Sequence, residues 1–341
     1  MKTLELLSIE KVTIQVVGNK TLGDGISFAD NTTDGSDIFL HIKALLSNTF
    51  NVQEEKRFDF VGSLDLNPVY KFSSAIFDDL ELFVSQSQNL ARYLYDQSLH
   101  PNIKSGDFFV IHGLFSVDNV NKDGLVFLKS ENKEVLISTR NDGKNITATP
   151  VYGMSLKKLD KGCIVLNDCR DEGFRVLTID KTNNGTDAHY WTESFLHVVG
   201  RDDDYHSTAN VADFCSSLVK EFKNDRDELC SATKAKMASQ LLVQSDTVTT
   251  EQIKTIFCDS DEAAHKYETF KAQFEESHGV LPQEFTPCQA ALKRKPITKL
   301  NSVKLGMDFE VKVLNPEADI ERGYDKEKGM RYYKLYFNEE K

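Results

Sequence analysis

The chain has 341 residues, enough for two domains and a sizeable buried core. Its formal net charge of −12 argues against a protein that coats DNA with its whole surface, because such proteins carry excess lysine and arginine to neutralise phosphates. No apolar run approaches the roughly 20 residues that span a membrane, and residues 1–10, with Glu5 and Glu10 and no small-residue cleavage site, do not resemble a signal peptide.

The first hundred residues alternate between strand and helix patterns. β-Branched residues predict a short strand over 12–17, and residues 57–61 predict another. Apolar residues at helical spacing predict a helix over 37–50 with an acidic start. The same spacing continues over 73–99 and predicts one long helix that ends before Pro101.

A β-rich block follows. Residues 107–115 and 124–129 are predicted to form antiparallel strands joined by the turn-rich segment 118–123. Residues 134–139 and 148–152, separated by the turn Asn141-Asp142-Gly143, are predicted to continue this block.

The segment Leu156–Val199 supplies the next two strands, over 163–166 and 174–179. A turn cluster at Asn183-Asn184-Gly185 precedes Trp191, the only tryptophan of the chain. One interpretation is a meander whose aromatic residues, Tyr190, Trp191 and Phe195, fill a core. The other is a binding edge, and the residue types alone do not decide between them.

The remaining chain is mostly helical in pattern. After the acidic run Asp202-Asp203-Asp204, Asn210 is a candidate N-cap for a helix with apolar residues from Val211 to Phe222. The other expected elements are helices over 232–245 and 250–276, the latter capped by Thr249 or Thr250, a break at Pro282 and Pro287, strands over 308–313 and 331–337, and a turn over 325–329.

These elements predict an α+β fold. An N-terminal mixed α/β domain with an antiparallel-rich sheet is expected over residues 1–204. A helical region with a basic link and a small C-terminal β-element, a terminal β-hairpin, is expected over residues 205–341.

Catalytic and cofactor motifs are missing from the sequence: it has no GxSxG, HExxH, P-loop or GxGxxG. We therefore expect no catalytic residues, no cofactor and no metal. The acidic run 202–204 could hold Mg²⁺ or Ca²⁺ and support a hydrolase or nuclease, but consecutive side chains do not converge on one ion in regular structure, so a solvated linker is the preferred interpretation. Six scattered cysteines without a CxxC pair favour reduced, structural thiols.

Positive charge is concentrated near the C-terminus. Residues 1–208 carry 21 basic and 30 acidic side chains, whereas residues 289–341 carry 12 and 9, a local net charge of +3. One basic cluster there has no acidic residue among its members and could contact phosphates: Lys293, Arg294, Lys295, Lys299 and Lys304. A solvated loop after Pro287 is the alternative. A second basic site comprises Lys157, Lys158 and Lys161.

The order of several local motifs resembles the 37-kDa nucleoid-associated protein family (NdpA-like), a group of bacterial cytoplasmic proteins. The motifs are Lys104-Ser105-Gly106-Asp107-Phe108-Phe109-Val110, Leu125-Val126-Phe127-Leu128-Lys129, Leu159-Asp160-Lys161-Gly162-Cys163, Val176-Leu177-Thr178-Ile179-Asp180 and Tyr190-Trp191. They cover residues 100–225 well and the rest of the chain loosely. The resemblance implies association with the bacterial nucleoid and brings no catalytic motif with it.

We therefore expect a non-enzymatic protein of the cytoplasmic nucleoid that binds DNA, double-stranded and without sequence preference, or a DNA-bound partner. The basic cluster is the expected contact, and a homodimer is the expected assembly. The alternative is a protein–protein interaction module without direct DNA contact, which the net charge of −9 over residues 1–208 favours.

Overall fold

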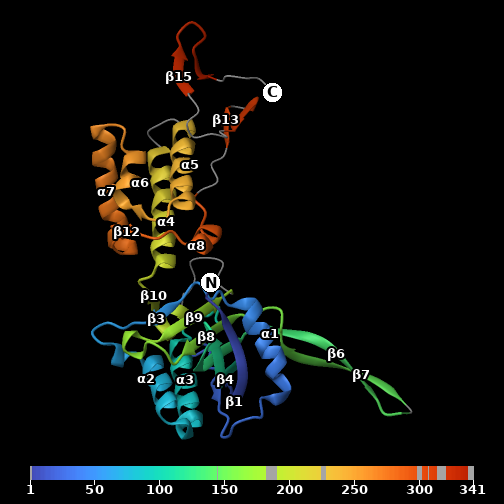
Figure 1. The fold of residues 1–341 in the computed structure, drawn as a ribbon. Coiled ribbons are helices and arrows are strands. Elements are labelled where there is room, and N and C mark those ends of the chain that lie inside the picture. Colours follow the sequence, from blue (N-terminus) through green and yellow to red (C-terminus); the bar gives the residue numbers. More distant parts are fainter. Residues whose placement is uncertain are drawn as a thin grey trace. The chain divides into compact units, whose positions relative to one another are not determined.

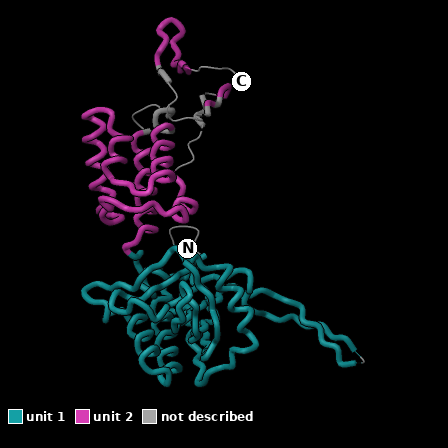
Figure 2. The backbone as a smooth tube through the Cα atoms, viewed as in Figure 1, with its two compact units in different colours: residues 1–201 teal, residues 202–341 magenta. Residues whose placement is uncertain are grey.

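The computed structural model describes residues 2–143, 145–181, 190–223, 228–297, 302–305, 307–312 and 320–336. The chain divides into two compact units, residues 1–201 and 202–341 (Figure 2). Helices and strands are mixed, and the predicted α+β class is confirmed. None of the helices in the described ranges combines the length and apolar character that crossing a membrane requires.

An antiparallel sheet forms the centre of unit 1 and, among the described residues, has eight strands in the order β10-β3-β9-β8-β5-β4-β1-β2. The strands are β1 (Leu4–Val17), β2 (Ile26–Ser27), β3 (Lys56–Phe58), β4 (Gly106–Val117), β5 (Val120–Ser130), β8 (Lys161–Leu166), β9 (Arg175–Asp180) and β10 (Val198–Gly200). Asp118 and Asn119, at φ 51° and 66°, make the turn between β4 and β5. Both residue types tolerate positive φ, so the turn is shorter than the predicted segment 118–123.

Helices cover both faces of this sheet (Figure 1). Alternate residues of one strand point to opposite faces, and Leu125 and Phe127 of β5 join one apolar cluster while Val126 and Leu128 join another. The first cluster includes residues from α2 (Pro68–Asp78) and α3 (Phe83–Gln97), and the second includes residues from α1 (Phe39–Thr49). Short 3₁₀ turns lie at Ser36–Ile38, Leu64–Leu66, Leu80–Leu82 and Arg170–Glu172.

The predicted single helix over 73–99 is wrong, because α2 ends at Asp78 and α3 begins at Phe83. Asp79 between them is extended (φ −148°, ψ 105°), and its side chain accepts a hydrogen bond from the Glu81 N–H at 3.0 Å. Such a local bond offers the backbone an alternative to the helix. The apolar spacing continues through this break, so periodicity does not reveal it.

The predicted strands over 134–139 and 148–152 are confirmed as β6 (Lys133–Asn141) and β7 (Ile146–Met154), which among the described strands pair only with each other. After β5, the next strand in the sheet is β8. The β6–β7 hairpin projects from the body of unit 1 (Figure 1). Almost every side chain on it is exposed.

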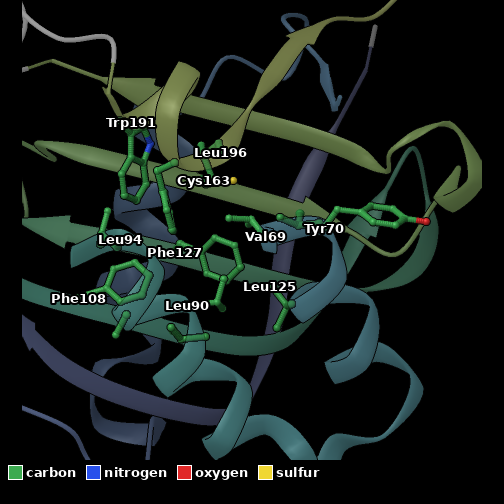
Figure 3. Close-up of a cluster of buried hydrophobic side chains, with 14 of the residues drawn as sticks. Val69, Tyr70, Leu90, Leu94, Phe108, Leu125, Phe127, Cys163, Trp191 and Leu196 are labelled. Carbon is green, nitrogen blue, oxygen red and sulfur yellow. The ribbon is translucent and has the colours of Figure 1, made fainter. Parts of the chain in front are cut away.

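The segment Leu156–Val199 contributes β8 and β9 to the sheet, followed by a π-helical turn over Tyr190–Leu196. Trp191 and Phe195 are 0 % exposed, and the Trp191 indole N–H donates to the Gly162 carbonyl at 3.1 Å. Figure 3 shows the indole in the cluster that includes Phe127. The core interpretation is therefore confirmed. The predicted turn at Asn183–Gly185 lies outside the described residues.

Unit 2 begins with a helical region whose core includes Phe214, Leu218 and Tyr267. Its helices are α4 (Asp204–Lys223), α5 (Glu228–Gln244), α6 (Thr250–Phe257), α7 (Asp261–His278) and α8 (Gln289–Arg294), and β11 (Val248–Thr249) pairs with β12 (Glu284–Phe285). Two small hairpins follow, β13 (Ser302–Leu305) with β14 (Phe309–Lys312) and β15 (Ile320–Asp325) with β16 (Met330–Leu335). The sequence predicted only one hairpin there.

Helix boundaries in unit 2 depend on side-chain caps. Asn210 is not an N-cap, because α4 begins at Asp204 and the Asp203 carboxylate accepts from the His206 N–H at 3.0 Å. The predicted cap at Thr249 is confirmed and forms a capping box with Gln252. The predicted helix over 250–276 is two helices, since Ser260 caps α7 by accepting from the Ala263 N–H at 3.2 Å.

The free thiols include Cys163, Cys169, Cys215, Cys258 and Cys288. Cys163 and Cys215 are buried, and burial raises the pKa of the Cys215 thiol to about 12. Cys169, by contrast, is exposed.

Candidate nucleic-acid interface

The centre of the predicted basic cluster lies at the end of α8. Lys293 and Arg294 form its last turn and Lys295 is its C-cap, so the predicted solvated loop is instead a short helix. All three side chains are exposed. Ala291 on the same helix is 1 % exposed and belongs to a small apolar cluster with Tyr205 of α4. The helix is therefore anchored by its apolar side while its end presents three cations.

The Lys295 ammonium is engaged within unit 2, because it forms an ion pair with Asp213 of α4. Lys299 lies outside the described residues. Lys304 is in β13, where its backbone partner is Glu310 of β14. The structure thus brings residues 293–295 together and does not show Lys299 or Lys304 beside them.

The acidic run at 202–204 serves as the start of a helix. Asp203 caps α4, as described above, and the Asp204 carboxylate accepts from the Thr286 N–H at 3.3 Å. No group of three or more His, Cys, Asp or Glu side chains in the described ranges is arranged to hold a metal ion. The solvated-linker interpretation is wrong for Asp203 and Asp204, since both stabilise backbone N–H groups in unit 2.

The second predicted basic site separates into exposed and buried parts. Lys157 and Lys158 are exposed, and their backbone N–H groups donate to the Ser155 hydroxyl. Lys161 is 1 % exposed, and its ammonium lies 2.8 Å from Asp180 and 4.9 Å from the ring centroid of Tyr190. A buried and paired lysine is not available to a phosphate, so Lys161 is excluded as a DNA contact.

Sequence reasoning did not anticipate a buried charged group beside Lys161. Lys129 is 0 % exposed; its ammonium donates to the Tyr190 hydroxyl at 3.1 Å and lies 3.2 Å from Glu131. The Tyr190 hydroxyl in turn donates to Glu131 at 2.7 Å. Burial lowers the pKa of Lys129 and raises that of Tyr190. The sequence feature that could have indicated this buried lysine is its position directly after the apolar run Leu125–Leu128, in a strand of the core.

A cavity of about 450 Å³ in unit 1 lies beside Arg170 and residues of α2. The Arg170 guanidinium donates to both carboxylate oxygens of Asp78, at 2.6 and 2.7 Å, and these bonds hold the pKa of Asp78 below its usual value. Because the guanidinium fork is already occupied by a carboxylate, this cavity offers no free cation from Arg170.

A family model described as nucleoid-associated protein YejK (NA37) matches residues 14–329, which is nearly the whole chain. No curated protein matches it significantly. The match extends from the second half of β1 into the turn before β16, and it covers both units. The chain therefore belongs to the YejK family of nucleoid-associated proteins, the 37-kDa family that its motifs resemble.

Proposed function

We propose that this protein is a non-enzymatic component of the bacterial nucleoid, in the cytoplasm, that binds double-stranded DNA without sequence preference. The proposed contacts are Lys293, Arg294, Lys295, Lys299 and Lys304. Membership of the nucleoid-associated family supports a role at the nucleoid. The presentation of three exposed cations at the end of α8 is the observation that carries the choice of surface.

A local cluster of positive charge can attract DNA even when the net charge of the whole protein is negative. The protein has a net charge of −12, but charges on an exposed surface are screened beyond roughly 8 to 10 Å at physiological ionic strength. A phosphate near α8 therefore interacts mainly with the adjacent cations. The distant acidic side chains slow association and weaken the complex, so we expect modest affinity and a strong dependence on salt.

The test compares wild-type protein with a Lys293→Ala/Arg294→Ala/Lys295→Ala variant in fluorescence-anisotropy titrations of mixed-sequence duplex DNA at several salt concentrations. The logarithm of the affinity falls as the logarithm of the salt concentration rises, and each lost phosphate contact reduces the magnitude of this slope by about 0.9. The variant should therefore bind all sequences more weakly, with a slope reduced by roughly 2 to 3. We expect the smaller value, because Lys295 already pairs with Asp213.

The matched control removes three exposed cations from unit 1 through Arg140→Ala/Lys157→Ala/Lys158→Ala. It changes the net charge by the same amount, so a general electrostatic effect would alter both variants alike. Equal salt slopes in the two variants would reject residues 293–295 as the contact. Failure of the wild type to bind duplex DNA at low salt would reject direct binding altogether.

The β6–β7 hairpin favours a second candidate function, a protein-interaction module without direct DNA contact. The backbone pairs Val135–Tyr152, Ile137–Pro150 and Asn141–Ile146 lie on one face of the hairpin. Val135, Ile137, Ile146 and Tyr152 on this face are 59, 68, 74 and 66 % exposed. An isolated two-stranded hairpin is only marginally stable in water, and covering such an apolar face would stabilise it.

In this second function the face would join two copies of the chain, which gives the expected homodimer a specific surface. Ile137→Thr should shift the protein toward monomers in sedimentation experiments, while Leu136→Thr on the opposite face should not. Both replacements place a threonine, which is β-branched and favourable in strands, at the substituted position. A protein that is monomeric at all concentrations, or equal effects of both variants, would contradict this use of the hairpin.

A further inference from the structure

The hairpin of β15 and β16, here called the terminal ribbon, separates its residues by chemistry. Its backbone pairs place alternate residues on opposite faces. One face, here called the arginine–tyrosine face, consists of three cross-strand pairs: Ile320 with Leu335, Arg322 with Tyr333, and Tyr324 with Arg331. These six positions include two arginines and two tyrosines and no acidic residue. Each arginine has a tyrosine as its cross-strand partner.

The opposite face of the ribbon differs in charge and in packing. Glu321 and Asp325 give it two acidic positions. The ring of Tyr332 lies directly over Gly323, in the space that a side chain at this position would fill. The Lys334 ammonium lies 5.6 Å from the centroid of the same ring. This face is therefore partly covered by its own side chains and would repel a polyanion at its acidic positions.

Three of the described side chains of the arginine–tyrosine face are exposed, and Tyr333 is half-buried. Tyr324 is 60 % exposed, Leu335 is 48 % exposed, and Arg331 is exposed. A two-stranded ribbon has no core of its own and is marginally stable in water. A partner that covered this face would stabilise the ribbon, and its charge and aromatic content define the partner chemistry.

We infer that the arginine–tyrosine face docks into the major groove of double-stranded DNA. The inference rests on the proposed DNA-binding function and adds a second surface to it. The major groove is about 12 Å wide and admits a two-stranded ribbon. Successive pairs on one face are about 6.8 Å apart, which is close to the rise of two base pairs. Arginine forks bind phosphates or guanine edges, and tyrosine hydroxyls bind phosphates.

The decisive comparison is between Arg331→Gln and Lys334→Gln in the full-length protein. The two positions lie on the same strand, both are exposed, and each change removes one positive charge, but they lie on opposite faces. Affinity for a 30-base-pair duplex of mixed sequence is measured by fluorescence anisotropy. Arg331→Gln should weaken binding roughly five-fold or more, whereas Lys334→Gln should change it less than about two-fold.

Two conservative variants test which groups of the arginine–tyrosine face contact the DNA. Tyr324→Phe keeps the ring and removes the hydroxyl, and it should weaken binding less than Arg331→Gln. Arg331→Lys keeps the charge but loses the fork, so it should restore only part of the affinity. If Arg331→Lys binds DNA with the affinity of the wild type, only the positive charge at this position matters. That result would overturn the inference that the arginine guanidinium makes the contact.

The outcomes distinguish this inference from the proposed function. If the wild type binds duplex DNA and the residue 293–295 variant loses affinity while Arg331→Gln matches Lys334→Gln, the proposed function stands and the inference falls. If the wild type prefers single-stranded DNA of the same length and only that binding depends on Arg331, the groove assignment is overturned. If the wild type binds no DNA, both fail together.

Discussion

Replacing Phe195 with alanine tests whether the aromatic segment after β9 is a closed core. Phe195 is 0 % exposed, and its ring centroid lies 5.0 Å from that of Trp191, 5.8 Å from Tyr93 and 6.2 Å from Phe108. A buried phenylalanine replaced by alanine costs about 3 to 5 kcal/mol, from lost apolar burial and from the cavity that remains. Three aromatic contacts place the expected loss in the upper part of this range.

The measurement is urea unfolding followed by the fluorescence of Trp191. Because this is the only tryptophan of the chain and belongs to unit 1, the signal reports on the unfolding of that unit. With a denaturant slope of roughly 2 to 3 kcal/mol per molar, a loss of about 4 to 5 kcal/mol should lower the midpoint by about 1.3 to 2.5 M. The slope itself should not change, since the same surface becomes exposed.

Val61→Ala is the control, because Val61 is 91 % exposed and its truncation should alter the unfolding free energy by less than about 0.5 kcal/mol. A loss below about 1 kcal/mol for Phe195→Ala would refute the reasoning. It would mean that the aromatic side chains do not form a closed core, and the alternative of a binding edge would regain support.

Three further predictions concern caps, protonation and domain boundaries. Asp203→Ala should lower the free energy of unfolding of unit 2 by about 1 kcal/mol, because Asp203 caps α4 by accepting a hydrogen bond from the His206 N–H. Asp202→Ala is the control and should have no such effect. Equal effects of the two variants in calorimetry would contradict this prediction. Burial lowers the pKa of His197 below its usual value, so near pH 6.5 the unfolded chain binds a proton that the folded chain does not. The free energy of unfolding should therefore fall as the pH decreases through about 6.5. His197→Gln should weaken this pH dependence in urea titrations at pH 7 and 5, and an unchanged profile would contradict the argument. Residues 1–204 and 205–341 are proposed to fold as separate domains. A fragment that starts at residue 202 should melt at a higher temperature than one that starts at residue 205, because the shorter fragment lacks the Asp203 cap. Similar melting temperatures of the two fragments would show that the cap is dispensable.

Local patterns were sufficient to predict the strands of the main sheet that lie in its centre. The apolar runs of β4, β5, β8 and β9 are bounded by turn residues, and both signals are local in sequence. The cap at Thr249 was predicted for the same reason, since its partner Gln252 is three residues away. The helix breaks at Asp79 and Ser260 were missed because apolar spacing continues across them and one side-chain hydrogen bond ends the helix.

The candidate interface shows a similar limit. Sequence reasoning identified the cations at 293–295, but the ion pair between Lys295 and Asp213 joins residues far apart in the chain. Lys161 was predicted to share a basic surface with Lys157 and lies buried beside Asp180 instead. The strand 331–337 was predicted from its alternation, whereas its pairing with β15, which brings arginine and tyrosine together, required the structure.

The sequence by itself determined the fold class, the family motifs and the concentration of positive charge near the C-terminus, because each is carried by composition or by neighbouring residues. The tertiary structure decided which apolar strands are covered. A run of consecutive apolar residues occurs in β5, where Leu125–Leu128 are buried, and also in β6, where Val135–Ile137 are exposed. It also decided which lysines remain free, because the cost of burying a charge is offset only by partners that folding brings close.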